Sequence, residues 1–232
     1  MKLKITRKHL MRGLIYVLGF FVTGLGVNIL LRGALGAGAW DTVIYNLRSF
    51  FTEILHVNVT LGTVSFFIYG IVLALVISYN KKLKYLFVLI PIFGISLAID
   101  FWDIVVFGNN YPTLIGVRLL LFVLGIFALT LGLSLIFVTK YPAMVFDELT
   151  LIVMKLMRSK SFFKARILIE LFAIVLASIF GFLSHIGFGA VNVGSFILAI
   201  IIGPMIELQL KWLRFLTKPL FDINTLSQKA PE

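Results

Sequence analysis

The sequence predicts an all-α, polytopic membrane protein in which six transmembrane helices form two inverted three-helix repeats. Each repeat is expected to carry a short interfacial or re-entrant helical segment. Three observations lead to this prediction. The composition is strongly apolar, six apolar runs are long enough to cross a bilayer, and the basic residues are confined almost entirely to alternate connections.

Composition alone separates this chain from soluble proteins. Of its 232 residues, 60% are hydrophobic and 13% are charged, and the mean hydropathy is +1.07. A soluble globular protein is about 45–50% apolar and about 25% charged, so this chain lacks the polar residues that would cover a surface in water. There is no Cys, and His9, His56 and His185 are scattered, so we expect neither a metal site nor a cofactor.

The predicted spans have about 20 apolar residues each, the length that crosses the hydrocarbon core. The first run is longer than the apolar core of a signal peptide, so we expect a retained helix. The chain then divides into a basic tail 1–12, a first repeat 13–107, a second repeat 108–213 and a C-terminal tail 214–232. In chain order the spans are about Gly13–Leu31, Thr60–Ser78, Tyr85–Phe107, Leu114–Val138, Phe163–Leu183 and Val193–Leu213.

The basic residues support a count of six spans. The formal net charge is +11, and 18 of the 21 Lys and Arg residues fall in the two tails or in connections on the same side as the tails. Only Arg32, Arg48 and Arg118 fall on the other side. Because basic residues favour the cytoplasmic side, both termini are predicted to be cytoplasmic. The charge is therefore attributed to membrane orientation and anionic lipid rather than to nucleic acid.

A weak internal repeat relates the two halves. The segments Trp40–Phe51 and Val145–Met157 are amphipathic, too short to span, and follow the first and fourth spans. In each segment an aromatic residue, Trp40 or Phe146, directly precedes an aspartate, Asp41 or Asp147. Each half then reads span, short segment, span, span. Since three is an odd number, the second half enters the bilayer from the opposite side, as in inverted-repeat secondary transporters.

The two aspartates have two interpretations. In the first, Asp41 and Asp147 are the N-caps of helices Thr42–Phe51 and Glu148–Met157. In the second, the two helix N-termini face a shared cavity in which the carboxylates bind a solute, a cation or a proton. The helix dipoles favour anions whereas the carboxylates favour cations, so the charge of the solute stays open.

Other candidate binding residues lie beside these aspartates or inside the spans. Arg166 and Glu170 are four residues apart and predict an ion pair on one helix face, which either neutralises charge at the interface or serves as a gate. Glu207 is the carboxylate that lies deepest in a span by its position in the sequence. The remaining candidates are Trp40, Phe146, Asn28, Gly36 and Gly38.

The stretch Gly36-Ala37-Gly38-Ala39-Trp40-Asp41 resembles the Gly-rich "G-P-W-D"-like signature in the first loop of the YczE/YyaS/YitT-type bacterial integral membrane protein family. Ala39 stands where proline is common in that family. The stretches Lys164–Glu170, Gly194-Ser195 and Ile202-Gly203-Pro204 are also similar to it. The resemblance covers most of the chain and implies a protein of the bacterial cytoplasmic (cell) membrane, but it implies no reaction.

The sequence favours a secondary transporter or exporter of a small solute, with a site between the two repeats. The alternative is a non-transporting accessory or regulatory protein that supports another membrane complex. No Walker, GxSxG or HExxH motif is present, so we do not expect an enzyme. The expected partners are the lipid bilayer and an unidentified small solute, not nucleic acid. Association with a second copy of the chain or with another membrane protein stays open.

Overall fold

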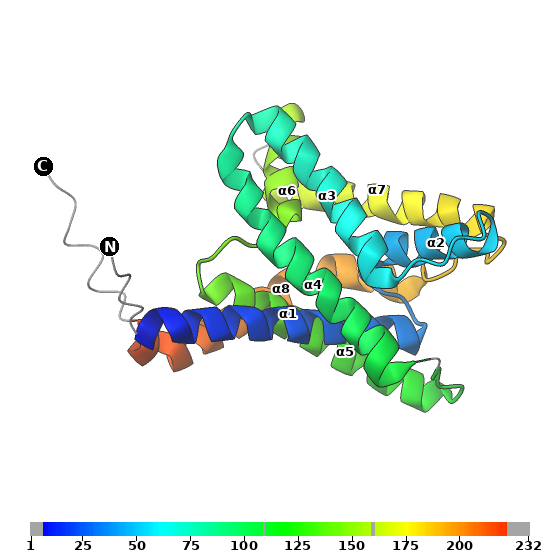
Figure 1. The fold of residues 1–232 in the computed structure, drawn as a ribbon, viewed down its shortest axis with the longest axis horizontal. Helices are drawn as coiled ribbons and strands as arrows, with labels where there is room; N and C mark the ends of the chain where they lie inside the picture. Colours follow the sequence, from blue (N-terminus) through cyan, green and yellow to red (C-terminus); the bar gives the residue numbers. More distant parts are fainter. Residues whose placement is uncertain (1–6, 109, 159–160, 222–232) are drawn as a thin grey trace, which may run out of the picture.

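The computed structural model describes residues 7–108, 110–158 and 161–221, and the regular structure in these residues is helical. The start of α1 and the end of α8 lie at the same end of the molecule (Figure 1). In chain order the elements are α1 (Arg7–Gly33), α2 (Ala39–Glu53), α3 (Leu61–Asn80), η1 (Leu83–Val88), α4 (Leu89–Asp100), η2 (Phe101–Phe107), α5 (Ile115–Val138), α6 (Val145–Leu156), α7 (Phe162–Leu183) and α8 (Val193–Phe221).

Within the described residues, six helical stretches are long and apolar enough to cross a membrane, which confirms the predicted number of candidate spans. Their ends differ most from the prediction at the two tails. The α1 helix already begins at Arg7, in a stretch of strong helix formers, and α8 continues past Pro219 to Phe221. The other parts of the predicted tails 1–12 and 214–232, residues 1–6 and 222–232, lie outside the described residues.

The third long stretch is not one regular α-helix. It begins as the 3₁₀ segment η1, continues as α4 and ends in the π-helical turn η2. The Gly108 N–H closes this turn by donating to the Asp103 carbonyl at 2.9 Å, and Gly108 has a φ of 54°. A π-turn is a rare interruption of an α-helix and is frequent at functional sites. Here it carries the buried Asp103.

The α1 and α5 helices approach each other closely because small residues occupy their contact. A Cβ on Gly26 of α1 would collide with the backbone of Leu129, and one on Gly132 of α5 would collide with the backbone of Thr23. Small residues allow this close packing in membrane helices. In the same way, Gly24 of α1 faces the backbone of α4. These glycines therefore serve the packing of α1 against α5 and α4.

The two short helices, α2 and α6, each pack on a long helix from the other half of the chain, α2 on α7 and α6 on α3 (Figure 1). Asn46 anchors α2 to α7 and to the chain that follows it. Its Nδ2 donates to the carbonyls of Ala177 at 2.8 Å and Phe188 at 3.0 Å, and its Oδ1 accepts from the Ala190 N–H at 2.9 Å. The side chain is fully buried, so these bonds hold α2 in place.

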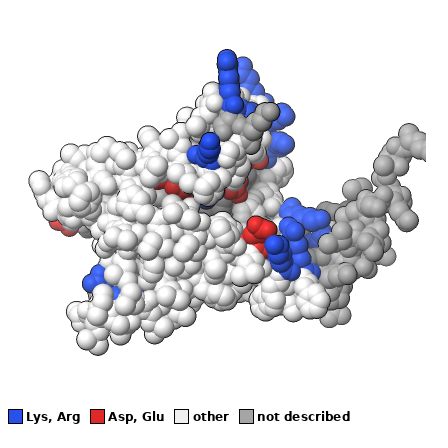
Figure 2. Space-filling model, turned by 180° about the vertical axis from the view of Figure 1, so that it is seen from behind, with Lys and Arg blue, Asp and Glu red and all other residues white. Residues whose placement is uncertain are grey.

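The surface separates charge from apolar area. Lys and Arg gather toward the end of the molecule that carries the starts and ends of the described chain, and carboxylates are visible in a recess near the middle of the same face (Figure 2). Many large apolar side chains on the long helices are exposed, among them Phe67 and Phe172. An exposed apolar surface of this extent is typical of helices that contact lipid.

Candidate functional site

A cavity of about 320 Å³, referred to below as the central cavity, lies at the N-terminal ends of α2 and α6. Its wall also includes residues of α1, α3, α5, α7 and α8, so both halves of the chain contribute to it. The charged residues of the wall are Asp41, Asp147, Arg166 and Glu170, referred to below as the cavity cluster. Asp41 and Asp147 therefore line the same cavity, while their role in binding stays a prediction.

Aromatic rings join the two short helices at the cavity. Trp40 of α2 stacks on Phe146 of α6, with 4.6 Å between ring centroids. Tyr69 of α3 meets the same Phe146 edge to face at 5.1 Å. The side chain of Trp40 is buried, and its indole Nε1–H has no hydrogen-bond acceptor among the described residues. All three rings line the cavity, so one wall of it is aromatic.

Arg166 of α7 holds two of the three acidic residues. Its Nη1 lies 2.8 Å from Asp147 Oδ1, and its Nε lies 2.8 Å from Glu170 Oε1. The second contact is the ion pair expected from the four-residue spacing. The first links α7 to the start of α6. Burial raises the pKa of Asp147, and the adjacent Arg166 guanidinium opposes this increase.

Asp41 has a different environment. Its side chain is buried, and its hydrogen bond within the described residues comes from the Tyr69 hydroxyl, which donates to Oδ1 at 3.4 Å. No described cationic side chain pairs with it. Asp41 lies on α2, outside the six long helices, and burial together with the negative charge of Glu170 raises its pKa to about 7, against a lowering by the Tyr69 hydrogen bond. Such a carboxyl exchanges a proton near neutral pH.

The prediction that Asp41 and Asp147 cap their helices is wrong. The α2 helix begins at Ala39 after Gly38, and α6 begins at Val145 after Met144, so each aspartate is the third residue of its helix. The extended backbone of Gly38 and Met144 starts each helix without a side-chain cap. The two carboxylates lie in the first turn of their helices, where they interact favourably with the helix dipole. Both aspartates are part of the cavity wall.

Three predicted candidates lie away from the cavity or support it only indirectly. Glu207 of α8 does not line the cavity, and its exposed side chain pairs with Lys211 at 3.0 Å. Asn28 of α1 is buried and bonds to the carbonyls of Gly24 and Ile99. Gly36 adopts a φ of +125° and lies against the backbone at Ser195, because only glycine fits this close approach.

Gly38 and the remaining predicted residues, Trp40, Phe146, Arg166 and Glu170, do line the cavity. The sequence missed Tyr69, which is the hydrogen-bond donor to Asp41. Tyr69 lies within the second span, and no local spacing in the sequence connects it with α2. Its role depends on the packing of α3 beside the start of α2 and α6, which is a long-range property.

Comparisons with known proteins agree with this architecture. Residues 10–211 match the family described as "Family of unknown function (DUF6198)". The chain belongs to this family. It is also 27% identical over 170 residues to a protein of Bacillus subtilis (strain 168) described as "Uncharacterized protein YyaS", a match that covers 73% of this chain and 81% of the relative. The predicted resemblance to YyaS-type proteins is confirmed. No solved structure matches the chain.

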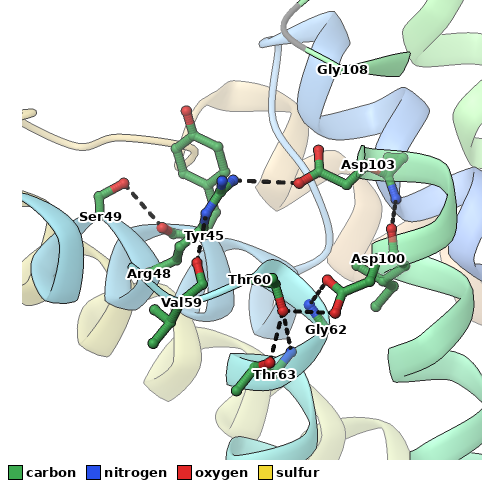
Figure 3. A network of polar contacts seen from close by, with 12 residues as sticks. Tyr45, Arg48, Ser49, Val59, Thr60, Gly62, Thr63, Asp100, Asp103 and Gly108 are labelled. Carbon is green, nitrogen blue, oxygen red and sulfur yellow. Dashed lines mark hydrogen bonds and ion pairs between the residues drawn. The ribbon is translucent and has the colours of Figure 1, made fainter. Parts of the chain in front are cut away.

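This DUF6198 member has a second group of polar and charged side chains, the end cluster of Asn28, Arg32, Arg48 and Asp103, where α1 ends and α5 begins. All of them except Arg48 are buried. Arg32 is buried and its Nη2 lies 2.9 Å from Asp103 Oδ1. The same guanidinium donates to Asn28 Oδ1 at 2.9 Å and to the carbonyl of Gly108 at 2.7 Å. Arg48 reaches Asp103 Oδ2 at 3.5 Å (Figure 3).

Further hydrogen bonds stabilise the same end of the molecule. Thr60 donates its hydroxyl to Asp100 Oδ2 at 2.6 Å, and the Gly62 N–H donates to Oδ1 at 2.6 Å (Figure 3). Asp100 thereby accepts hydrogen bonds from two donors at the N-terminus of α3. Arg118 donates to the carbonyls of Gly33 and Ala34 and satisfies the end of α1. All three arginines that the sequence places opposite the other basic residues thus bind protein groups here.

Proposed function

We propose that this protein is a secondary transporter of a small solute, with its binding site between two inverted repeats. The observation that carries the proposal is the central cavity, in which the N-terminal ends of α2 and α6 meet and present Asp41 and Asp147. Transporters built from inverted repeats bind solutes near the middle of the bilayer, at short or interrupted helices whose N-termini face the site.

The pairing of helices supports the repeat. Each half has a long helix, a short helix and two further long stretches, in the order α1 to η2 and α5 to α8. The first long helices of the two halves, α1 and α5, pack on each other. The short helix α2 packs on α7, and the short helix α6 packs on α3, which is the corresponding helix of the first half. In both short helices the aromatic residue is second and the aspartate third. A twofold relation between residues 13–107 and 108–213 accounts for all of these correspondences.

We further infer that α2 and α6 are re-entrant and that both termini are cytoplasmic, in the cytoplasmic membrane of a bacterium. The excess of Lys and Arg at the end that carries the termini supports this orientation. Because the chain has no cysteine, single cysteines can be introduced directly. We expect Lys82→Cys to react with an impermeant maleimide from the cytoplasmic side and Asn110→Cys from the outer side. The reverse labelling would exclude this orientation.

Transport is tested with purified protein in liposomes. Currents on a solid-supported membrane are recorded while organic cations, zwitterions, organic anions and neutral sugars are applied in turn, at several internal and external pH values. At least one class should drive a response that protein-free liposomes lack. Asp147→Asn should reduce that response at least about tenfold, because it removes a charged partner of the cavity cluster, whereas Glu207→Gln should not change it.

The same experiment separates the two functions considered for this chain. Absence of a response to every class at every pH would contradict the transport proposal. If the protein also copurified in mild detergent with one defined membrane protein, an accessory role would account for the result.

A further inference from the structure

We propose that the central cavity takes monovalent organic cations with an apolar body, whose cationic group is held beside Asp41. This inference rests on the proposed transport function, because it names the class of solute that the same site accepts. It resolves the question of charge that the sequence left open.

The first argument is the balance of charge. The cavity wall carries three carboxyl groups and one guanidinium. Arg166 is already bound to Asp147 and Glu170, both at 2.8 Å, so its charge is not free for an anionic solute. Asp41 has no cationic partner within the described chain, although its side chain is only 7% exposed. A buried carboxylate of this kind is stabilised by a bound cation or a bound proton.

The helix N-termini do not reverse this balance. The starts of α2 and α6 favour negative charge, but each already has an aspartate in its first turn. An anionic solute would therefore meet two dipoles that are already compensated and carboxylates that outnumber the arginine. A cation would instead complete the pairing of the cavity cluster.

The second argument is the apolar and aromatic wall. Trp40, Tyr69 and Phe146 line the cavity beside Asp41, and aromatic rings attract organic ammonium groups. A small inorganic cation would need several oxygen ligands in place of its water. The described acids are not grouped as a metal site. Apart from the cavity cluster, most residues of the wall are apolar, so they match a hydrocarbon body.

The third argument concerns size. A cavity of about 320 Å³ lies at the small end of the range for ligand sites, about 300–1,000 Å³.

The test compares matched probes on protein in lipid nanodiscs, with empty nanodiscs subtracted. The probes are 4-(trimethylammonio)phenol, its neutral isostere 4-tert-butylphenol, and the anion 4-hydroxybenzenesulfonate. We expect the cation to bind at least about tenfold more tightly than the isostere, because only the cation pairs with the Asp41 carboxylate. A tenfold ratio of the two affinities corresponds to a difference of about 1.4 kcal/mol in binding free energy. The sulfonate should bind more weakly than either.

Variants then locate the charge that selects the probe. Asp41→Asn should weaken binding of the cation at least about tenfold and leave binding of 4-tert-butylphenol unchanged. Glu207→Gln changes a carboxylate to an amide outside the cavity and should leave both unchanged. Equal binding of the cation and the isostere to the parent protein would overturn the proposal, and this comparison decides even if Asp41→Asn does not fold. Unchanged cation binding by a folded Asp41→Asn would overturn it as well.

The outcome is separable from that of the transport proposal. Flux of an anionic or neutral solute without selective binding of the cation would contradict the solute class and leave transport standing. Selective binding of the cation, with no flux of any solute in liposomes, would support the class of ligand and contradict transport.

Discussion

The end cluster and the cavity cluster contain the same kinds of side chain in different states of pairing. In the end cluster, Arg32 and Arg48 surround a single buried carboxylate, Asp103, and Arg32 also donates to backbone carbonyls. In the cavity cluster, one arginine binds two carboxylates, and among the described residues the carboxyl of Asp41 has only the Tyr69 hydroxyl as a partner.

This difference suggests different roles. The end cluster joins the end of α1 to the π-turn η2 and to the following chain. Within the described residues, the Nε of Arg32 has no hydrogen-bond acceptor. We interpret it as a structural clamp. The cavity cluster has surplus negative charge beside open space, so a ligand or a proton completes it. Five predictions test this contrast, in order of decreasing effect.

The largest effect is expected for Arg32→Met, which removes the charge but keeps a long apolar side chain. Asp103 would remain buried with only the distant Arg48, so the free energy of unfolding should fall by about 3 kcal/mol. Tryptophan fluorescence during thermal unfolding in detergent measures the change. Arg48→Met is the matched control and should cost clearly less, because the Arg48 side chain is 34% exposed. Equal losses in the two variants would contradict the clamp.

A smaller loss of stability is expected for Arg166→Gln. It leaves Asp147 and Glu170 without their shared cation, and charged hydrogen bonds of this kind contribute about 2 kcal/mol. The double variant Arg166→Gln/Glu170→Gln should recover part of the loss, because it removes the buried charge that the first change leaves unpaired. Additive losses in a double-mutant cycle would show that the two residues act independently.

Binding of 4-(trimethylammonio)phenol should depend on pH. We propose that the ionised form of Asp41 binds the cation. Because burial raises the pKa of Asp41 to about 7, affinity should then rise about tenfold from pH 6 to pH 8. Glu170, Asp147, Arg166 and Tyr69 face the same space. The Asp41→Asn variant therefore serves as the reference, and any slope that it retains belongs to those groups. A parent protein with no slope would contradict the assignment to Asp41.

Stability should follow Asp41 in the opposite sense. The folded protein holds a proton on Asp41 up to about pH 7, whereas the unfolded chain loses it near 3.8. The Asp41 contribution is therefore fully present below the lower value and is lost as pH rises toward the higher one.

The smallest effect is expected for Glu207→Gln, which removes an exposed pair worth about 0.3 kcal/mol and should leave unfolding nearly unchanged.

The sequence was sufficient for the local part of the architecture. Long apolar runs gave the six candidate spans to within a few residues, except at the tails, because span length is set by the thickness of the bilayer. The pair Arg166 and Glu170 was found because helix geometry alone brings residues four apart together. The shared aromatic and aspartate pair led to both short helices.

Long-range contacts and exact helix starts were not accessible in this way. Arg32 and Asp103 are 71 residues apart in the chain, and their pairing depends on the crossing of α1 with η2. Gly38 and Met144 start the short helices by backbone conformation, so the side-chain preference for aspartate caps was misleading. Glu207 was chosen for its position along a span, but rotation about the helix axis, which position alone does not fix, leaves it exposed.

The close approach of α1 and α5 limits how a transporter of this shape could move. Where Gly26 meets the backbone of Leu129 and Gly132 meets that of Thr23, no layer of side chains remains along which the two helices could slide. Opening the site to either side of the membrane would then require the other helices to rotate around α1 and α5, while these two helices stay fixed relative to each other. A cross-link between α1 and α5 should be harmless to turnover, whereas one between α2 and α6 should stop it.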